Sequence, residues 1–96
     1  MIYNRAPKTR GKIMPSPVWI VYMLRCADDT VYTGITNNLD RRMVMHYEGK
    51  GAKYTRGRGP FEIIFLEQQD SRSAALKREA ALKKLSRSDK ILMSNR

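Results

Sequence analysis

The pattern of apolar and polar positions predicts three β-strands. Residues 18–26 read VWIVYMLRC and are apolar at nearly every position, which is typical of a central strand covered on both faces. Residues 30–36 (TVYTGIT) and 61–67 (FEIIFLE) are rich in β-branched and aromatic side chains and predict two further strands. The Ala-Asp-Asp sequence at 27–29 is a turn signal, so the first two strands are expected to form an antiparallel hairpin.

The register of this hairpin depends on the length of its turn. A three-residue turn places Tyr22 opposite Gly34. Tyr22 and Tyr32 then share one face of the sheet, because opposite residues of an antiparallel pair point the same way. A two-residue turn would place the two tyrosines on opposite faces.

Helical periodicity predicts two helices. The first covers residues 39–48, with an asparagine at 37 or 38 as its N-cap and Gly49 at its end. The second is capped by Asp or Ser at 70–71 and continues to residue 85.

The remaining segments predict an arm, a loop and a last helical turn. Residues 1–17 carry four cations, three prolines and no acid, which is typical of a disordered basic arm, and Met14 within them is an alternative translation start. Residues 49–60 form a Gly-rich loop, and a short helical turn is expected within 86–96. Residues 18–96 are therefore expected to form one α+β domain, a small three-stranded antiparallel sheet flanked by helices in the order β-β-α-β-α.

Composition narrows the class of protein. With 19 Lys and Arg against 9 Asp and Glu, the formal charge is +10, which favours a polyanionic partner, nucleic acid first and an anionic membrane surface second. The apolar runs are far shorter than the about 20 residues of a membrane-spanning helix. The single Cys26 excludes an internal disulfide and a multi-cysteine zinc site and suits the reducing cytoplasm, where we expect the protein to act.

The charge is concentrated beside one predicted loop. Six cations lie between residues 41 and 58 against one acid, Glu48. Glycines let a backbone approach phosphate closely, and an aromatic side chain among cations can stack on a base. A solvated surface loop is the alternative. We expect nucleic acid to be bound by Arg41, Lys50, Lys53, Tyr54, Arg56 and Arg58.

Glu79 is the carboxylate that the helical pattern singles out. It falls between Ala75 and Leu76 on the helical wheel, toward the apolar side, where a carboxylate is costly unless it is paired or binds a cation. The alternative to a cation site is an ion pair with Lys83 at i, i+4. His46 is the only histidine, and spacing alone leaves it without a second zinc ligand.

Taken together, these residues resemble the GIY-YIG nuclease family. Its first motif corresponds to Ile20-Val21-Tyr22 and its second to Tyr32-Thr33-Gly34, followed by Arg42 in the first helix and Glu79 in a later helix. Ile35 stands where some members carry lysine, and His46 stands where others carry tyrosine. The resemblance covers residues 18–85 and is greatest to small stand-alone bacterial members; it extends to excision-repair incision domains and structure-specific resolvases.

The resemblance implies a metal-dependent DNA endonuclease. Glu79 would hold one Mg²⁺ or Mn²⁺, and Arg42 would bind the scissile phosphate. Tyr32 or Tyr22 would accept the proton of the attacking water, with His46 as the alternative carrier. Gly34 and Asn38 would play supporting roles.

Two functions remain in competition at this point. The first is an endonuclease of low sequence specificity in DNA repair or processing, with a protein partner as a source of substrate choice. The second is a non-catalytic nucleic-acid-binding module that retains the GIY-YIG fold. Cleavage that depends on Glu79 would distinguish them, and membrane binding is not expected.

Overall fold

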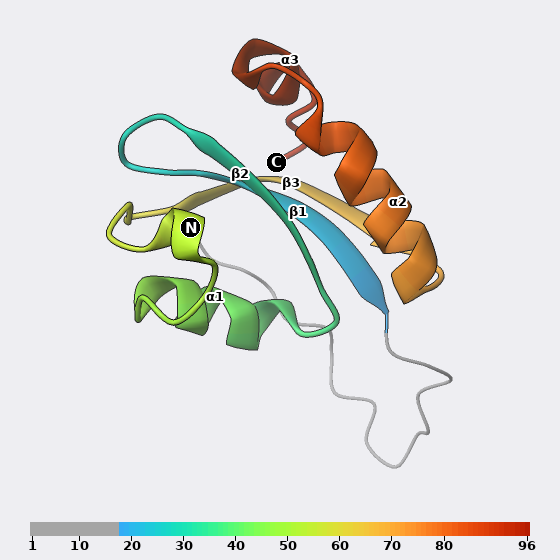
Figure 1. Cartoon of the computed structure of the whole chain (residues 1–96), viewed down its shortest axis with the longest axis horizontal. Coiled ribbons are helices and arrows are strands. Elements are labelled where there is room, and N and C mark those ends of the chain that lie inside the picture. Colours follow the sequence, from blue (N-terminus) through green and yellow to red (C-terminus); the bar gives the residue numbers. More distant parts are fainter. Residues whose placement is uncertain (1–17) are drawn as a thin grey trace.

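The computed structural model describes residues 18–96, and the predicted basic arm at 1–17 lies outside them. The described chain contains a three-stranded sheet and helices on both of its sides (Figure 1). No helix among these residues is long and apolar enough to cross a bilayer. The elements are β1 (Trp19–Arg25), β2 (Val31–Thr36), α1 (Leu39–Tyr47), the 3₁₀ turn η1 (Lys53–Thr55), β3 (Glu62–Gln69), α2 (Arg72–Lys83) and α3 (Arg87–Leu92).

The sheet has the order β2-β1-β3, and both pairs are antiparallel. Tyr22 lies opposite Gly34, and the Cys26 amide donates to the Thr30 carbonyl at 2.8 Å, so the three-residue turn is confirmed. β1 is the central strand, as its continuous apolar sequence predicts. β2 is an edge strand of the sheet that the described residues form.

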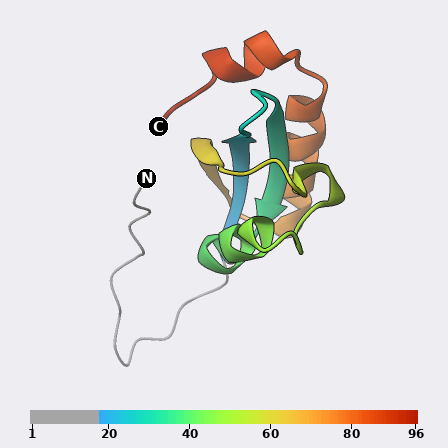
Figure 2. The same ribbon diagram turned by 90° about the vertical axis from the view of Figure 1, so that its left-hand side faces the viewer.

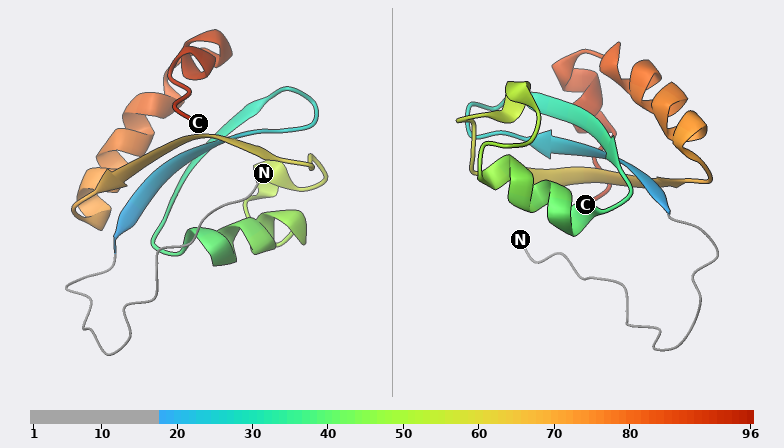
Figure 3. Two further views of the ribbon diagram at one scale, coloured as in Figure 1. Left: turned by 180° about the vertical axis from the view of Figure 1, so that it is seen from behind. Right: turned by 60° about the horizontal axis from the view of Figure 1, so that its bottom comes forward.

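The two faces of the sheet are covered by different helices (Figures 2 and 3). On one face α1 contributes Leu39 to a cluster with Tyr22 and Leu24 of β1. On the other face α2 contributes Ala75 and Leu82 to a cluster that includes the alternate residues of β1, Val21 and Met23, and α3 adds Ile91 at its margin. The strand alternation of period two therefore assigns each face its own helix layer.

Capping side chains set where the helices begin. The Asn38 side chain accepts from the Arg41 amide at 3.1 Å, and the Ser71 hydroxyl accepts from the Ala74 amide at 3.0 Å, which resolves both open N-cap alternatives. Gly49, with φ of 75°, follows α1 and ends it as expected. α2 ends at Lys83, two residues before its predicted end.

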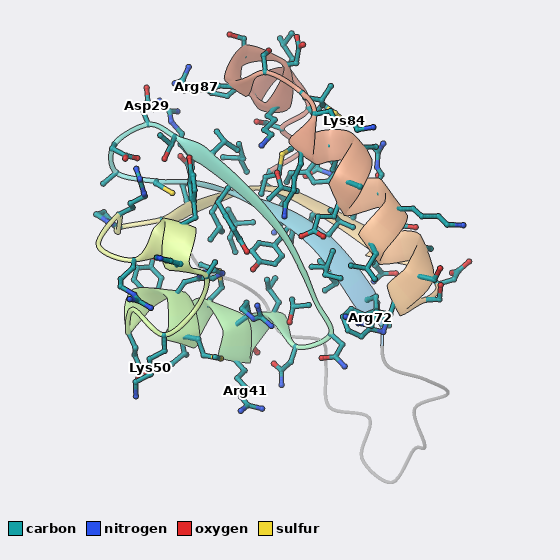
Figure 4. All side chains as sticks on the ribbon, viewed as in Figure 1. Asp29, Arg41, Lys50, Arg72, Lys84 and Arg87 are labelled. Carbon is teal, nitrogen blue, oxygen red and sulfur yellow. The ribbon has the colours of Figure 1, made fainter. Side chains whose placement is uncertain are left out.

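Two segments are more regular than the sequence predicts. The Gly-rich loop contains η1, and within residues 86–96 the short helix α3 (Arg87–Leu92) begins after Ser86 as its N-cap. Asp29 in the hairpin turn binds the Arg87 guanidinium at 2.6 Å and the Arg25 guanidinium at 2.6 Å (Figure 4). This ion pair joins α3 to the turn of the β1–β2 hairpin.

The α2 layer yields a stability prediction. Leu82 is 1% exposed in the core, whereas Leu92 on α3 is 82% exposed. Leu82→Ala is expected to lower the free energy of unfolding by about 2–5 kcal/mol, because it removes buried methyl groups and leaves a cavity. Leu92→Ala is expected to change it by no more than about 0.5 kcal/mol. Urea unfolding of both variants checks this, and equal losses would contradict the assigned layer.

Candidate active site

A buried chain of hydrogen bonds crosses the α1 face of the sheet. The Tyr22 hydroxyl lies 2.8 Å from Nε2 of His46, and Nδ1 of the same imidazole lies 2.8 Å from the Thr55 hydroxyl. The Thr55 hydroxyl in turn donates to the Ala52 carbonyl at 2.9 Å. All three side chains are at most 2% exposed, so these polar groups satisfy one another without solvent.

The three side chains of this hydrogen-bonded series come from three separate elements. Tyr22 comes from β1, His46 from the last turn of α1, and Thr55 from η1 in the loop that follows. Two glycines make room for the rings. A Cβ at Gly34 would lie 2.8 Å from the Tyr22 hydroxyl, and a Cβ at Gly51 would lie 2.6 Å from Nδ1 of His46. The supporting role predicted for Gly34 therefore has a steric reason: only a glycine lets Tyr22 cross β2.

Burial and a nearby guanidinium set the protonation of the two rings. Burial raises the pKa of the Tyr22 hydroxyl above its usual value, Tyr32 raises it further, and the charge of Arg42 opposes this only in part. Burial, and then the charge of Arg42, lowers the pKa of His46 to about 4. At neutral pH the site therefore holds a protonated phenol beside a neutral imidazole that can accept a proton.

Arg42 lies on α1. It is close enough to the buried hydrogen bonds to affect Tyr22 and His46, and its side chain lines a small pocket. The pocket has a volume of about 250 Å³ and lies at the start of the helix. Asn38 caps the helix and thereby fixes the turn from which Arg42 projects. Backbone amides at a helix start and a planar guanidinium both favour an anion. The lining residues are Thr36, Asn37, Asn38, Arg41, Arg42 and Met45.

Tyr32 links the buried chain to the loop surface. Its ring is 6.1 Å from that of Tyr22 and 5.4 Å from the imidazole of His46. Tyr54 stacks on Tyr32 with the ring centroids 5.9 Å apart, and the Arg58 guanidinium lies 4.7 Å from the centroid of Tyr54. Tyr54, the aromatic side chain that the sequence predicts to stack on a base, therefore already packs against Tyr32 and Arg58.

Among the cations predicted to bind nucleic acid, one makes contacts within the protein and the others have exposed side chains. Arg58 forms an ion pair with Asp28 and donates from Nε to the Tyr54 carbonyl, so it also holds the loop against the hairpin. Arg41, Lys53 and Arg56 have exposed side chains, and Lys50 is exposed and 3.9 Å from Glu48. Arg41 and Lys50 project from the same side of the molecule in Figure 4.

Glu79 lies in the other helix layer. It projects from α2, its side chain is 16% exposed, and it pairs with Lys83 at 3.3 Å, so the alternative ion pair is present. Its neighbour Arg78 binds Glu67 of β3 at 2.8 Å. Successive helical residues point about 100° apart, and the buried side of α2 lies between Arg78 and Glu79. Because Arg78 faces β3, Glu79 faces the opposite edge of the sheet, the β2 edge.

Four of the five predicted catalytic residues therefore lie together on one face of the sheet. Tyr22, Tyr32, Arg42 and His46 share the α1 face, whereas Glu79 approaches β2 from the α2 face. One polar group on that second face stands out: the Thr33 hydroxyl of β2 is 2% exposed and has no hydrogen-bond partner among the described residues.

Thr55 is the residue of this buried chain of hydrogen bonds that sequence reasoning missed. Its importance arises from a contact with His46, nine positions earlier, across the fold of the loop. Neither helical nor strand periodicity reports such a contact. The nearest sequence signal is Gly51, whose lack of a side chain allows the loop to pass close over the imidazole.

Comparisons with known proteins agree on one family. A family model described as the GIY-YIG catalytic domain matches residues 18–92. A UPF0213 protein of Oceanobacillus iheyensis is 52% identical over 71 residues, which are 74% of this chain and 83% of that protein. Another, from Natronomonas pharaonis, is 56% identical over 70 residues, covering 73% and 82%. A solution NMR structure of an E. faecalis protein is 40% identical, covers 80% of this chain and 82% of that one, and superposes with a TM-score of 0.58.

The buried imidazole yields a prediction of pH-dependent stability. The pKa of His46 is about 4 in the folded chain against an ordinary value of 6.5. Between these values the unfolded chain binds more protons, so the free energy of unfolding falls as pH decreases from 6.5 to 4. Urea unfolding between pH 7.5 and 4.5 measures this slope. The His46→Gln variant lacks the imidazole and is expected to show a flatter curve; parallel curves would contradict the assignment.

Proposed function

Because the chain belongs to the GIY-YIG family, a nuclease family whose substrates are nucleic acids, we propose that it is a metal-dependent endonuclease that hydrolyses phosphodiester bonds in DNA. The proposal rests above all on one observation, the buried chain from Tyr22 through His46 to Thr55 beside Arg42. Hydrolysis needs a group that takes a proton from water and a cation that stabilises charge on phosphorus. This site has residues suited to both tasks.

The proton path begins at the tyrosine that solvent reaches. Tyr22 is fully buried, whereas Tyr32 beside it is half-buried. In the proposed reaction, water gives a proton to the Tyr32 hydroxyl as it attacks phosphorus. Tyr32 passes its own proton to the Tyr22 hydroxyl, and Tyr22 passes its proton to Nε2 of His46, which is 2.8 Å away. The neutral imidazole is the final acceptor in this relay. Because burial and the charge of Arg42 hold its pKa at about 4, the transfer requires a bound phosphate whose negative charge offsets that of Arg42.

Arg42 is assigned to the phosphate. Its guanidinium is permanently charged and can donate two parallel hydrogen bonds to phosphate oxygens. The charge of Arg42 lowers the pKa of both Tyr22 and His46, so Arg42 is close to both side chains. A scissile phosphate bound to Arg42 would therefore lie next to the proton path. The adjoining pocket at the start of α1 offers room for a phosphate along the same strand of DNA.

The residues near β2 fit a metal that arrives with its substrate. GIY-YIG nucleases generally depend on a divalent metal. Among residues 18–96 no three His, Cys, Asp or Glu side chains gather into a metal site. Glu79 is a single carboxylate, and Mg²⁺ often binds one or two carboxylates together with waters and substrate phosphates. The unpartnered Thr33 hydroxyl on the same face suits a hydrated ion. A bound Mg²⁺ or Mn²⁺ would supply charge stabilisation for the phosphate and the departing oxygen.

Substrate choice is expected to depend on shape and charge. The exposed cations of α1 and the loop contact phosphates, which carry no base sequence, so the proposed enzyme has low sequence specificity. We assign it to DNA repair or processing in the cytoplasm, with a protein partner as a source of specificity. A non-catalytic binding module is favoured by two observations. Glu79 is occupied by its ion pair with Lys83, and it lies in the helix layer on the opposite face of the sheet from Tyr22 and Tyr32.

Replacing the assigned residues tests catalysis. Glu79→Gln and Tyr22→Phe are each expected to lower the cleavage rate of plasmid or branched DNA with Mg²⁺ by about 100-fold or more, because they remove a metal ligand and a proton carrier. DNA affinity is expected to stay within about twofold.

Matched control variants are available for both substitutions. Glu62→Gln also removes a carboxylate, an exposed one on β3, and Tyr47→Phe also removes a bonded hydroxyl, which donates to the Phe61 carbonyl at 3.0 Å. Both controls are expected to cleave at the wild-type rate. Cleavage that survives Glu79→Gln at full rate would contradict the enzyme assignment, and salt-dependent binding without turnover in the wild-type protein would favour the binding module.

The exposed loop cations yield a separate prediction for binding. Lys53→Ala and Arg56→Ala are each expected to weaken binding of any DNA sequence and to reduce the slope of log K against log salt by about 1, because each cation releases counterions from phosphate. Lys77→Ala removes an exposed cation of α2 and Lys84→Ala one at its C-cap, both in the helix layer of the other face, and they are expected to leave the slope unchanged. Fluorescence anisotropy at several salt concentrations measures it. Equal effects of all four variants would place the DNA elsewhere.

A further inference from the structure

We propose that Thr55 is a positioning residue that holds the His46 imidazole as the tautomer with hydrogen on Nδ1, leaving Nε2 free to accept the proton of Tyr22. This inference rests on the proposed function for its catalytic consequence. Its structural content, the tautomer, can be measured without any cleavage assay.

The number of hydrogens at Thr55 and His46 favours one tautomer. The Thr55 hydroxyl has one hydrogen and lies within bonding distance of two groups, the Ala52 carbonyl at 2.9 Å and Nδ1 of His46 at 2.8 Å. If that hydrogen goes to Ala52, Nδ1 must carry a hydrogen and donate it to the Thr55 oxygen. Nε2 then has a lone pair, and the Tyr22 hydroxyl donates to it.

The opposite tautomer makes fewer bonds. With hydrogen on Nε2, the imidazole would donate to the Tyr22 oxygen, and Nδ1 would need the single hydrogen of Thr55. The bond from Thr55 to the Ala52 carbonyl would then be lost. Only the tautomer with hydrogen on Nδ1 makes all three bonds. In the other tautomer the Ala52 carbonyl still accepts from the Thr55 amide at 3.1 Å, but the buried Tyr22 hydroxyl loses Nε2 as its acceptor, which is costly.

Neighbouring groups pack closely around the His46 imidazole. Gly51 passes so close that a Cβ there would lie 2.6 Å from Nδ1, and the Phe61 ring centroid is 5.9 Å from that of the imidazole. Thr55 itself is 1% exposed, so water does not compete for Nδ1. The charged group that faces the imidazole is Arg42, which favours the neutral form and so makes the choice of tautomer matter.

This contact gives the loop a second role. The segment that carries Lys53 and Arg56 for DNA also carries Thr55 between them, which orients the base. An orienting group behind a general base is the arrangement that activates catalytic histidines elsewhere. The loop therefore couples the grip on phosphate to the readiness of the proton acceptor.

A long-range ¹H–¹⁵N spectrum of the imidazole tests the inference. His46 is the only histidine of the chain, so each signal belongs to this site. At pH 7 the wild-type protein is expected to show a protonated Nδ1 and an unprotonated Nε2. Thr55→Ser keeps the hydroxyl and is expected to keep the pattern. Thr55→Val has nearly the same shape without the hydroxyl, and is expected to give mixed tautomers and a cleavage rate lower by roughly 10–100-fold at unchanged DNA affinity.

The outcomes separate this inference from the proposed function. A wild-type spectrum with hydrogen on Nε2 would overturn it whether or not the protein cleaves DNA, and so would an unchanged spectrum in Thr55→Val. The expected spectra in a protein without nuclease activity would support the assignment of Thr55 while refuting the proposed function. If Thr55→Val fails to fold, the wild-type and Thr55→Ser spectra still decide the tautomer.

Discussion

The need to satisfy polar groups in a buried face of the sheet organises this domain. Tyr22 and His46 occupy positions that a small domain normally gives to apolar side chains, and each must find a hydrogen-bond partner. They find each other, and Thr55 completes the chain. This requirement explains why glycines stand at 34 and 51, and why a loop rich in glycine and cations folds back over the end of α1 instead of extending into solvent.

The edge position of β2 follows from the same arrangement and determines where chemistry can occur. The strand separates two layers, with Arg42 and the tyrosines on one side and Glu79 on the other. Because no further strand pairs with β2 among residues 18–96, we expect a phosphodiester at this edge to reach groups from both faces. In the proposed reaction, positive charge on the α1 side would attract the substrate, and the carboxylate on the α2 side would offer the hard oxygen ligand that a divalent cation prefers.

Local sequence patterns were sufficient for most of the fold and for part of the site. The continuous apolar run in 18–26 predicts the central strand, and polar residues before α1 and α2 mark their beginnings. The sequence left the turn at two or three residues, and the structure selects three, which places Tyr22 opposite Gly34. Helical periodicity predicts that Glu79 points toward the core, but it does not show which side of α2 faces which strand. The ion pair between Arg78 and Glu67 of β3 determines this, and it forms only in the folded protein. Thr55 could not be found because its contact arises from the path of a loop.

A crystal structure of the protein with a DNA containing a non-hydrolysable phosphate and Mn²⁺ would test the central claim most directly. The claim is that the groups on the two sides of β2 act on one phosphate. It predicts a phosphate at the open edge of β2 in contact with Arg42, and a metal bound to Glu79 and to that same phosphate. A phosphate held only by the loop cations, with Glu79 still paired to Lys83, would contradict it.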